Sequence, residues 1–272
     1  MPAPAALAEN GAVDSGRVAW LHIAPVKSMA LTAVDSIELG VDGVSDNRRF
    51  MVVDADDHMV NGKRLGALVQ VQPGWHATSA TLTLVLPDGG RVSGTVALGE
   101  SRAAVVFGGE RRVRVVEGPW SAALSDWAGH PLRLVQPEAP GDGVDRTREA
   151  GATLLATASL QALAASMGES SVDPRRFRML IGVDGIPAYA EDGWVSRRVR
   201  VGEATVLVHG NVGRCVVTTQ HPDSGRVDLP TLRTLQRVRG EVETTEPLPF
   251  GVWAEVVQPG RVTLGDPCTV VD

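Results

Sequence analysis

The chain contains 272 residues, of which 43% are hydrophobic and 21% charged, and its formal net charge is −6. This composition excludes collagen, a coiled coil and a wholly disordered chain. An acidic balance without a basic tract is not typical of proteins that bind nucleic acid or anionic lipid. No apolar run approaches the roughly 20 residues that a membrane-spanning helix requires. We therefore expect a protein that acts on a small molecule, away from nucleic acid and membranes.

The two cysteines, Cys215 and Cys268, are too few for a disulfide framework. Two cysteines fit a reducing compartment, and a single bridge between them stays open as the alternative. The segment 1–16 is rich in Ala and Pro, but it lacks the charged start and the continuous apolar core of a secretory signal. We expect this segment to be a disordered tail and the protein to be cytoplasmic.

Residues 17–136 have the pattern of a β-rich domain. Short Val-rich runs alternate apolar and polar residues, and Gly, Asp and Pro separate them, which is typical of strands joined by turns. A tight hairpin is expected at 87–90, because Asp and Gly tolerate positive φ. So many short strands close together predict a β-barrel or a sandwich. The expected strands are 18–23, 36–39, 49–53, 68–71, 81–86, 91–96, 103–107 and 111–116.

Residues 137–148 are polar and rich in turn-forming residues. We expect a linker or mobile loop here, followed by a second domain over 149–272. That domain should contain a helix at 157–168, which begins with a capping hydroxyl and ends with Gly, and another at 230–239, where apolar residues recur on one face. The fold class is therefore mainly β with small helices. The expected strands of the second domain are 179–183, 199–201, 205–208, 215–217, 251–257 and 262–271.

Cys215 is the first candidate for chemistry. It follows a Gly-rich loop and Arg214, and positive, accessible surroundings lower the pKa of a thiol and allow nucleophilic attack or metal binding. The structural alternative is a small buried residue that begins a strand, which is the interpretation we favour for Cys268. His209 and His221 flank Cys215 at equal distance, but this spacing matches no compact zinc motif.

Basic and hydroxyl residues at the ends of predicted strands form a second set of candidates. Arg binds phosphate through two hydrogen bonds and Lys supplies a compact charge, so such residues at the turns of an acidic protein indicate a local anion pocket. The alternative is a solvated surface. No Walker A loop or dinucleotide fingerprint follows a strand, which argues against a nucleotide fold of those kinds. The residues occur in four groups, at 25–28, 47–50, 61–64 and 175–178.

The expected turn at 190–194 contains two adjacent carboxylates, Glu191 and Asp192, before an aromatic residue. General acid–base work by Asp192 is one interpretation, and a turn or capping role is the other. No Gly-x-Ser-x-Gly elbow occurs in the sequence, so hydrolase chemistry through serine has no support.

Taken in chain order, these motifs resemble the MOSC family, named for the C-terminal domain of molybdenum cofactor sulfurase, together with its usual N-terminal β-barrel partner. Pro-Val-Lys-Ser at 25–28 and the run at 47–54 are similar to the opening of the N-terminal partner. The second half matches more specifically through five ordered motifs: 190–194 with 201–203, Gly-Arg-Cys-Val-Val-Thr-Thr at 213–219, 222–225, 232–235, and 250–251 with 259–262 and 265–267.

The resemblance implies two β-rich units with a pyranopterin molybdenum cofactor between them. It makes Cys215 the molybdenum ligand, in agreement with the argument from the residues for a soft thiolate ligand at this position. Asp192 is the second candidate catalytic residue. Arg178 is followed by Met179 and Leu180, where relatives commonly have Pro and Asn. The candidate cofactor-binding residues, from the resemblance and the anion-pocket argument together, are Lys27, Ser28, Arg49, Arg64, Thr153, Arg178, Asn211 and Arg214.

By this resemblance the chain is expected to be a molybdenum-cofactor-dependent oxidoreductase that reduces N-hydroxylated or other N-oxygenated small molecules. Two cysteines cannot hold an iron–sulfur cluster, which normally takes four thiolates, so a separate electron-donor protein is expected. Three alternatives stay open. They are a sulfur carrier with a persulfide on Cys215, a cofactor-free enzyme that uses the Cys215 thiolate toward an anionic metabolite, and a binding module without catalysis.

Overall fold

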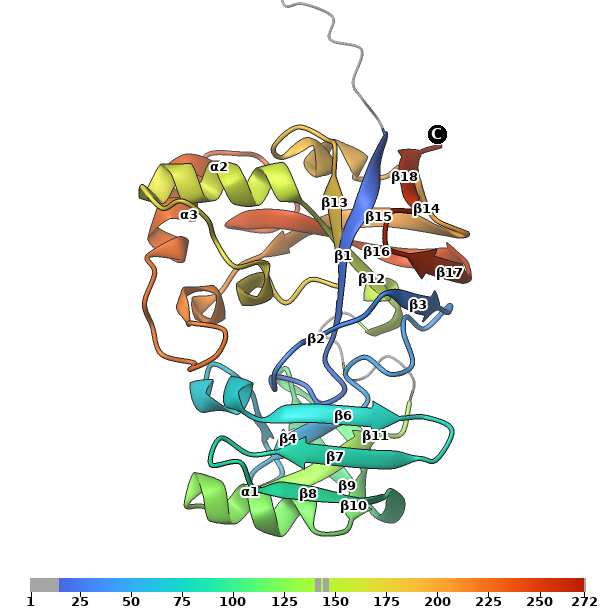
Figure 1. The fold of residues 1–272 in the computed structure, drawn as a ribbon, viewed down its shortest axis with the longest axis vertical. Coiled ribbons are helices and arrows are strands. Elements are labelled where there is room, and N and C mark those ends of the chain that lie inside the picture. The colour runs from blue at the N-terminus through green and yellow to red at the C-terminus, as the bar shows by residue number, and fades with distance from the viewer. Residues whose placement is uncertain (1–14, 140–142, 144–146, 272) are drawn as a thin grey trace, which may run out of the picture.

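The computed structural model describes residues 15–139, 143 and 147–271. Two β-rich units lie one above the other in Figure 1, with the second half of the chain forming most of the upper unit. Strands make up 43% of the structure and helices 20%, so the predicted mainly β fold class is confirmed.

The upper unit is a seven-stranded barrel. Its strands follow the order β13-β12-β16-β15-β14-β18-β1, and a pairing between β13 and β1 closes the ring. Alternating Val residues direct one face of each strand inward, as in β14 (Arg198–Val201), where both valines are fully buried. The other barrel strands are β1 (Ser15–Ile23), β12 (Ala152–Ala156), β13 (Ile181–Asp184), β15 (Ala204–Gly213), β16 (Pro249–Gln258) and β18 (Pro267–Val270).

β1 comes from the opposite end of the sequence to the strands that it joins. It pairs with β18 at residues 15–17 and with β13 at residues 17–21. Gly16 permits this approach, because a Cβ there would lie 2.4 Å from the Asp184 carbonyl oxygen. The barrel therefore needs a strand that precedes the predicted domain start at 149. The predicted tail over 1–16 overlaps β1 at its last two residues, and residues 1–14 lie outside the described residues.

The lower unit pairs strands from the first half of the chain. One sheet has the order β5-β4-β11-β10-β9, and a bridge between His58 and Val105 connects its two edges. A second sheet, β6-β7-β8, and helix α1 (Trp120–Ala128) cover a core in which Trp120 and Phe50 are fully buried. The strands are β4 (Met51–Val53), β5 (Met59–Val60), β6 (Gln72–His76), β7 (Thr81–Val85), β8 (Arg91–Thr95), β9 (Ala97–Val106), β10 (Gly109–Glu117) and β11 (Arg133–Pro137).

Two expected strands are 3-10 helices instead. The run 68–71 lies mostly in η1 (Gly66–Gln70), and the run 215–217 overlaps η5 (Val216–Thr219), which begins directly after Cys215. Runs this short have no period that separates a strand from a tight helical turn. Helix α1 also lies where no element was predicted.

The two predicted helices of the upper unit are confirmed. α2 (Thr157–Met167) ends at Gly168, whose φ of 77° is favourable for glycine, and α3 (Thr231–Arg239) packs against it. Both lie on one side of the barrel in Figure 1. Across the described residues, no helix is both long enough and apolar enough to cross a bilayer.

Two short pairings lie beside the barrel, and residues of one of them, Ile37, Leu39 and Val262, pack into its core. β3 (Ser36–Leu39) pairs with β17 (Gly260–Thr263), and β2 (Thr32–Ala33) pairs with the end of β1. Within the predicted linker at 137–148, residues 140–142 and 144–146 lie outside the described residues. The remaining 3-10 helices are η2 (Thr147–Ala150), η3 (Pro174–Phe177) and η4 (Ala190–Trp194).

Glu191, in η4, is a fully buried carboxyl group beside the barrel. Its Oε1 accepts hydrogen bonds from the Ser159 hydroxyl at 2.8 Å and the Ala156 amide at 3.3 Å, while its Oε2 has no hydrogen-bond partner among the described residues. Burial raises the pKa of Glu191 to about 7, because the charged form loses its hydration. The folded state therefore holds this proton more tightly than the unfolded state does.

Glu191→Gln should flatten the pH dependence of stability. Because the folded-state pKa is raised, the stabilisation from neutral Glu191 is fully present below the ordinary value of 4.5 and is lost as the pH rises through about 7. Between pH 5 and pH 9 we expect the free energy of unfolding of the wild type to fall by roughly 2–3 kcal/mol relative to Glu191→Gln, measured by urea denaturation. Glu243→Gln, at an exposed carboxylate, should keep the wild-type dependence. Parallel curves for the wild type and Glu191→Gln would contradict this account.

Candidate functional site

A cavity of about 350 Å³ lies where the two units meet. Its walls come from both halves of the chain, including 61–63 and the tip of the β9–β10 hairpin on one side and 212–218 on the other. The cavity brings together six of the predicted site residues, which are Lys27, Ser28, Thr153, Arg178, Arg214 and Cys215.

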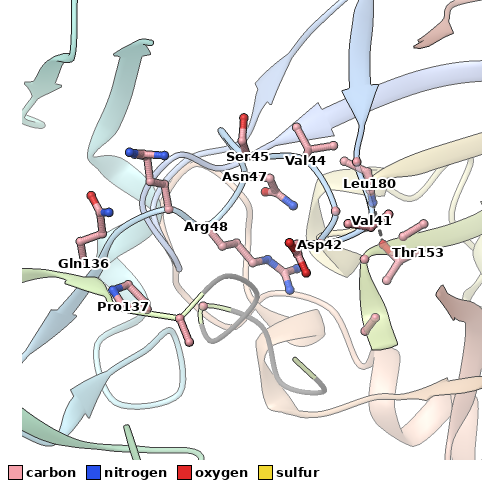
Figure 2. Close-up of a pocket in the computed structure, with 18 of the residues that line it drawn as sticks. Val41, Asp42, Val44, Ser45, Asn47, Arg48, Gln136, Pro137, Thr153 and Leu180 are labelled. Atoms are coloured by element: carbon pink, nitrogen blue, oxygen red, sulfur yellow. Dashed lines mark hydrogen bonds between the residues drawn. The ribbon is translucent and has the colours of Figure 1, made fainter. Parts of the chain in front are cut away.

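A second cavity, of about 450 Å³, adjoins the first, and Arg48, Ala150 and Thr153 line both. Figure 2 shows the Arg48 side chain extending into the second cavity from the loop before β4. The Thr153 hydroxyl accepts a hydrogen bond from the Leu180 amide at 2.9 Å, drawn as a dashed line in Figure 2. Arg49, another predicted cofactor-binding residue, lines this second cavity and not the first.

Cys215 stands between the end of β15 and the start of η5. Its backbone is extended, and its carbonyl accepts hydrogen bonds from the amide and the hydroxyl of Thr218, at 3.1 and 3.0 Å. These bonds fix the position of the residue while its thiol is free and partly exposed at the cavity. Cys215 is therefore not a small buried residue that begins a strand, which was the structural alternative. Cys268 is a residue of that kind, since it is fully buried in the barrel and burial raises the pKa of its thiol to about 12.

Arg214 lines the cavity and also holds its own loop in place. Its Nε donates to the Phe250 carbonyl at 2.8 Å, and its Nη1 donates to the Phe177 carbonyl at 3.0 Å. The guanidinium also lies 5.5 Å from the Phe177 ring centroid. These contacts tie the Cys215 loop to β16 and η3, so Arg214 positions the loop that carries the thiol.

Lys27 and Arg178 bring positive charge to the cavity. The Lys27 ammonium is buried, donates to the Gly143 carbonyl at 3.2 Å and lies 4.4 Å from the Phe107 ring centroid. The Arg178 Nη2 donates to the Met29 carbonyl at 2.8 Å, and among the described residues no carboxylate pairs with this guanidinium. Burial and the neighbouring charge of Arg48 lower the pKa of Arg178, although a guanidinium stays protonated at neutral pH. This corner of the cavity therefore favours an anion.

Two other basic residues of the four predicted groups, Arg64 and Arg176, have carboxylate partners. Arg64 pairs with Asp54 at 2.6 Å and lies outside both cavities. Arg176 borders the first cavity but forms two hydrogen bonds to Asp228, at 2.6 and 2.7 Å. Both guanidinium groups are thus held by carboxylates of the protein, and buried Arg176 is not part of a solvated surface.

Asp192 and Asn211 lie outside both cavities. The Asn211 Nδ2 donates to Asp192 Oδ1 at 2.7 Å, and Arg239 pairs with the other oxygen of the same carboxylate. This network fastens the end of α3 to the barrel. The structure thus places Asp192 in a structural ion pair, away from Cys215.

Among the cavity residues that the sequence did not single out are an aromatic ring and a carboxylate, Phe107 and Glu246. Phe107 occupies the tip of the β9–β10 hairpin, and Glu246 follows α3 in a loop. Neither belongs to a motif, and only the hairpin turn at 107–108 left a local signal, in the Gly-Gly that follows Phe107. Their place at the cavity depends on long-range packing.

The histidines beside Cys215 do not form a zinc site with it. His209 contacts Glu255 at 3.1 Å. Within the described part of the chain, no three His, Cys, Asp or Glu side chains gather as metal ligands. A metal at Cys215 would need further ligands beyond the His, Cys, Asp and Glu side chains that the structure describes.

Comparison with protein families identifies the architecture. Residues 142–269 match the MOSC domain, and residues 15–117 match the MOSC N-terminal beta barrel domain. The chain belongs to the MOSC family. The order of the two matches agrees with the order of the two units, with β1 inside the N-terminal match even though it closes the MOSC barrel.

Curated proteins similar to this MOSC protein include amidoxime-reducing components and a molybdenum cofactor sulfurase. Mitochondrial amidoxime-reducing component 1 of Xenopus laevis is 29% identical over 93% of this chain and 81% of its own length. Its namesake from Danio rerio is 26% identical over 93% of this chain and 84% of its own length. Molybdenum cofactor sulfurase of Oryza sativa subsp. japonica is 36% identical over 76 residues, which are 26% of this chain and 9% of that protein.

The donor groups of the two adjoining cavities fit an anionic ligand that carries a thiolate-binding metal. Arg49 and Arg178 form no ion pair with any described residue, and the Nε of Arg49 is buried without a hydrogen-bond partner among them. A buried guanidinium without a counter-charge is costly unless a ligand supplies one. The thiol of Cys215 adds the soft ligand.

We expect iodoacetamide to label Cys215 and to spare Cys268 in the native protein. The Cys215 thiol is partly exposed, whereas Cys268 is buried and its raised pKa disfavours the reactive thiolate. Peptide mass mapping after a short exposure at neutral pH measures the two sites separately, and both should react after denaturation. Faster labelling of Cys268 than of Cys215 in the native state would contradict the structure.

Proposed function

We propose that this MOSC protein is a molybdenum-cofactor-dependent oxidoreductase that reduces N-hydroxylated or other N-oxygenated small molecules, with Cys215 as the protein ligand of molybdenum. The observation that carries the proposal is the meeting of the Cys215 thiol with the cations Lys27 and Arg178 in one cavity. The similarity to two amidoxime-reducing components over 93% of the chain supports the same reaction class.

The residues that would hold the cofactor divide by chemistry. Lys27, Ser28 and Arg178 would bind its phosphate and pterin groups, because a guanidinium offers parallel N–H donors to phosphate and an ammonium adds a compact charge. Arg49, in the adjoining cavity, would add a second guanidinium. Cys215 would bind the metal through its thiolate. When bound, the cofactor supplies a centre that exchanges two electrons with the substrate.

Reduction of an N–OH group to N–H and water consumes two electrons and two protons. Glu246 is the carboxylate that lines the cavity among the described residues, and its Oε2 accepts a hydrogen bond from the Gly213 amide at 3.0 Å. Glu246 would therefore hold and pass a proton beside the loop that carries Cys215. Because two cysteines are fewer than the four thiolates of an iron–sulfur cluster, we infer that a separate protein donates the electrons.

A sulfur-carrier function would use the same thiol. The similarity to a molybdenum cofactor sulfurase over 76 residues favours this second candidate. Cys215 would then hold a persulfide, and incubation with a sulfur donor would add the mass of one sulfur atom to the peptide that contains it. Molybdenum in the purified protein, without such an added mass, would favour the oxidoreductase.

Protein purified from a host that makes the cofactor should contain molybdenum and reduce an amidoxime when supplied with an electron donor. Cys215→Ser should lower kcat by at least about 100-fold, since even the loss of residues behind a metal ligand costs 10–100-fold. Cys268→Ser is the matched control and should keep the activity. The proposal would be contradicted by wild-type protein that contains no molybdenum and cannot be reconstituted with the cofactor, or by full activity in Cys215→Ser.

The role of Arg178 in cofactor binding is tested by comparing Arg178→Gln with the control variant Arg64→Gln. Arg178→Gln removes a guanidinium that has no carboxylate partner among the described residues, and the lost charge-assisted hydrogen bonds should lower cofactor affinity by about tenfold or more. Arg64→Gln breaks a pair with Asp54 and hydrogen bonds to the carbonyls of His58 and Met59, all outside the cavity, and should not change affinity. Molybdenum and pterin retained after dialysis measure both. Equal retention in the two variants would remove Arg178 from the site.

A further inference from the structure

The tip of the β9–β10 hairpin carries a residue that its turn does not favour. Val106 pairs with Gly109, so Phe107 and Gly108 form a two-residue loop, with φ of 52° and 78°. These values are those of a type I′ turn, in which Asn, Asp or Gly is preferred at the first position. A bulky aromatic residue with positive φ is strained there.

Packing does not explain why an aromatic residue occupies this turn. Phe107 is 40% exposed, and it belongs to none of the hydrophobic clusters of the described residues. A Cβ on Gly108 would meet nothing within 4 Å, so the turn itself is open to solvent. The strain is therefore not compensated by burial in either core.

The Phe107 ring instead lies at the cavity of Cys215. It is among the residues that line this cavity, together with Val69 and Val217, and the buried ammonium of Lys27 is 4.4 Å from its ring centroid. The cavity thus has a polar, cationic part and an apolar part in which Phe107 is the aromatic residue nearest to solvent. Strained residues that serve no core are found at ligand-binding sites.

We propose that Phe107 is a specificity-determining residue of this cavity, whose ring packs against a flat, aromatic group of the substrate while the N–OH group reaches the Cys215 end. The inference rests on the proposed function and adds a preference within it, for aryl over small alkyl N-hydroxylated compounds. Aromatic pairs add a favourable contact beyond their buried area, and a methyl group in the same place gains little of it.

The test compares benzamidoxime with acetamidoxime in the wild type and Phe107→Asn. Asn suits the type I′ position, so the melting temperature of the variant should be no lower than that of the wild type. We expect KM for benzamidoxime to rise about fivefold or more, from the size of an aromatic contact, and KM for acetamidoxime to change by less than about twofold. Molybdenum content should be unchanged. Equal changes for the two substrates, or none, would overturn the proposal.

Two further variants separate recognition from folding. Phe107→Tyr keeps the ring and should keep the preference for benzamidoxime. Ala80→Asn relieves a positive φ of 48° in the turn before β7, outside this cavity, and should leave both KM values unchanged. Loss of the aryl preference in Phe107→Tyr together with a lowered melting temperature would assign a structural role to Phe107 and overturn the proposal.

A direct measurement of substrate binding tests the role of Phe107 without requiring the protein to reduce the substrate. Titration calorimetry with benzamidoxime and acetamidoxime, on the same purified proteins, should show weaker binding of benzamidoxime alone to Phe107→Asn. If the wild type reduces neither compound, the proposed function fails, while the calorimetric comparison still decides the role of Phe107. Identical benzamidoxime affinity in the wild type and Phe107→Asn would then refute it.

Discussion

The closure of the upper barrel by β1 is the constraint on which the site depends. β1 pairs with β13 and β18, and the chain then leaves the barrel directly into the segment that carries Lys27. The Lys27 amide donates to the Phe50 carbonyl of the lower unit, and Arg178 of the upper unit donates to the carbonyl of Met29. A strand from the start of the sequence thus completes a barrel built from its end, and hydrogen bonds from the segment after it join the two units that flank the cavity. The site between them is built on this frame.

The arginines of this frame are of two kinds: some hold loops in place, and others bring positive charge to the cavities. Arg176 directs both Nη atoms to Asp228, and Arg214 directs its donors to backbone carbonyls, so these two guanidinium groups hold loops in place. Arg49 and Arg178 have no such carboxylate among the described residues. Desolvation makes an unpaired guanidinium costly, and the cost is tolerated where a ligand brings the opposite charge. Position along the sequence does not distinguish the two kinds of arginine, since Arg176 and Arg178 are two residues apart.

Sequence motifs predicted the mainly β class and the positions of Lys27, Ser28 and Cys215 at one cavity, because these residues lie in short segments with their own local pattern. They did not predict partners that arrive from elsewhere in the chain. Asp192 looks like a free turn carboxylate until Arg239, 47 residues later, is placed beside it. The same holds for the role of β1, whose alternating pattern shows a strand but not the sheet that it joins. Phe107 reaches the cavity only through the register of a long hairpin.

Several residues with a strained, positive-φ backbone line the cavity that contains Cys215. Among the described residues other than glycine, positive φ occurs at Ser28, Arg48, Phe107 and Arg178, all of which line it, and at five positions elsewhere. Each such conformation costs on the order of 1–3 kcal/mol and survives only where the surrounding structure fixes it. None of these four is Asn or Asp, the residues that tolerate positive φ best. Their side chains supply a hydroxyl, two guanidinium groups and an aromatic ring to the cavity. The strained backbone conformation is therefore found where the chemistry of these side chains is needed. The barrel closed by β1 supplies the rigid surroundings that hold these residues in that conformation.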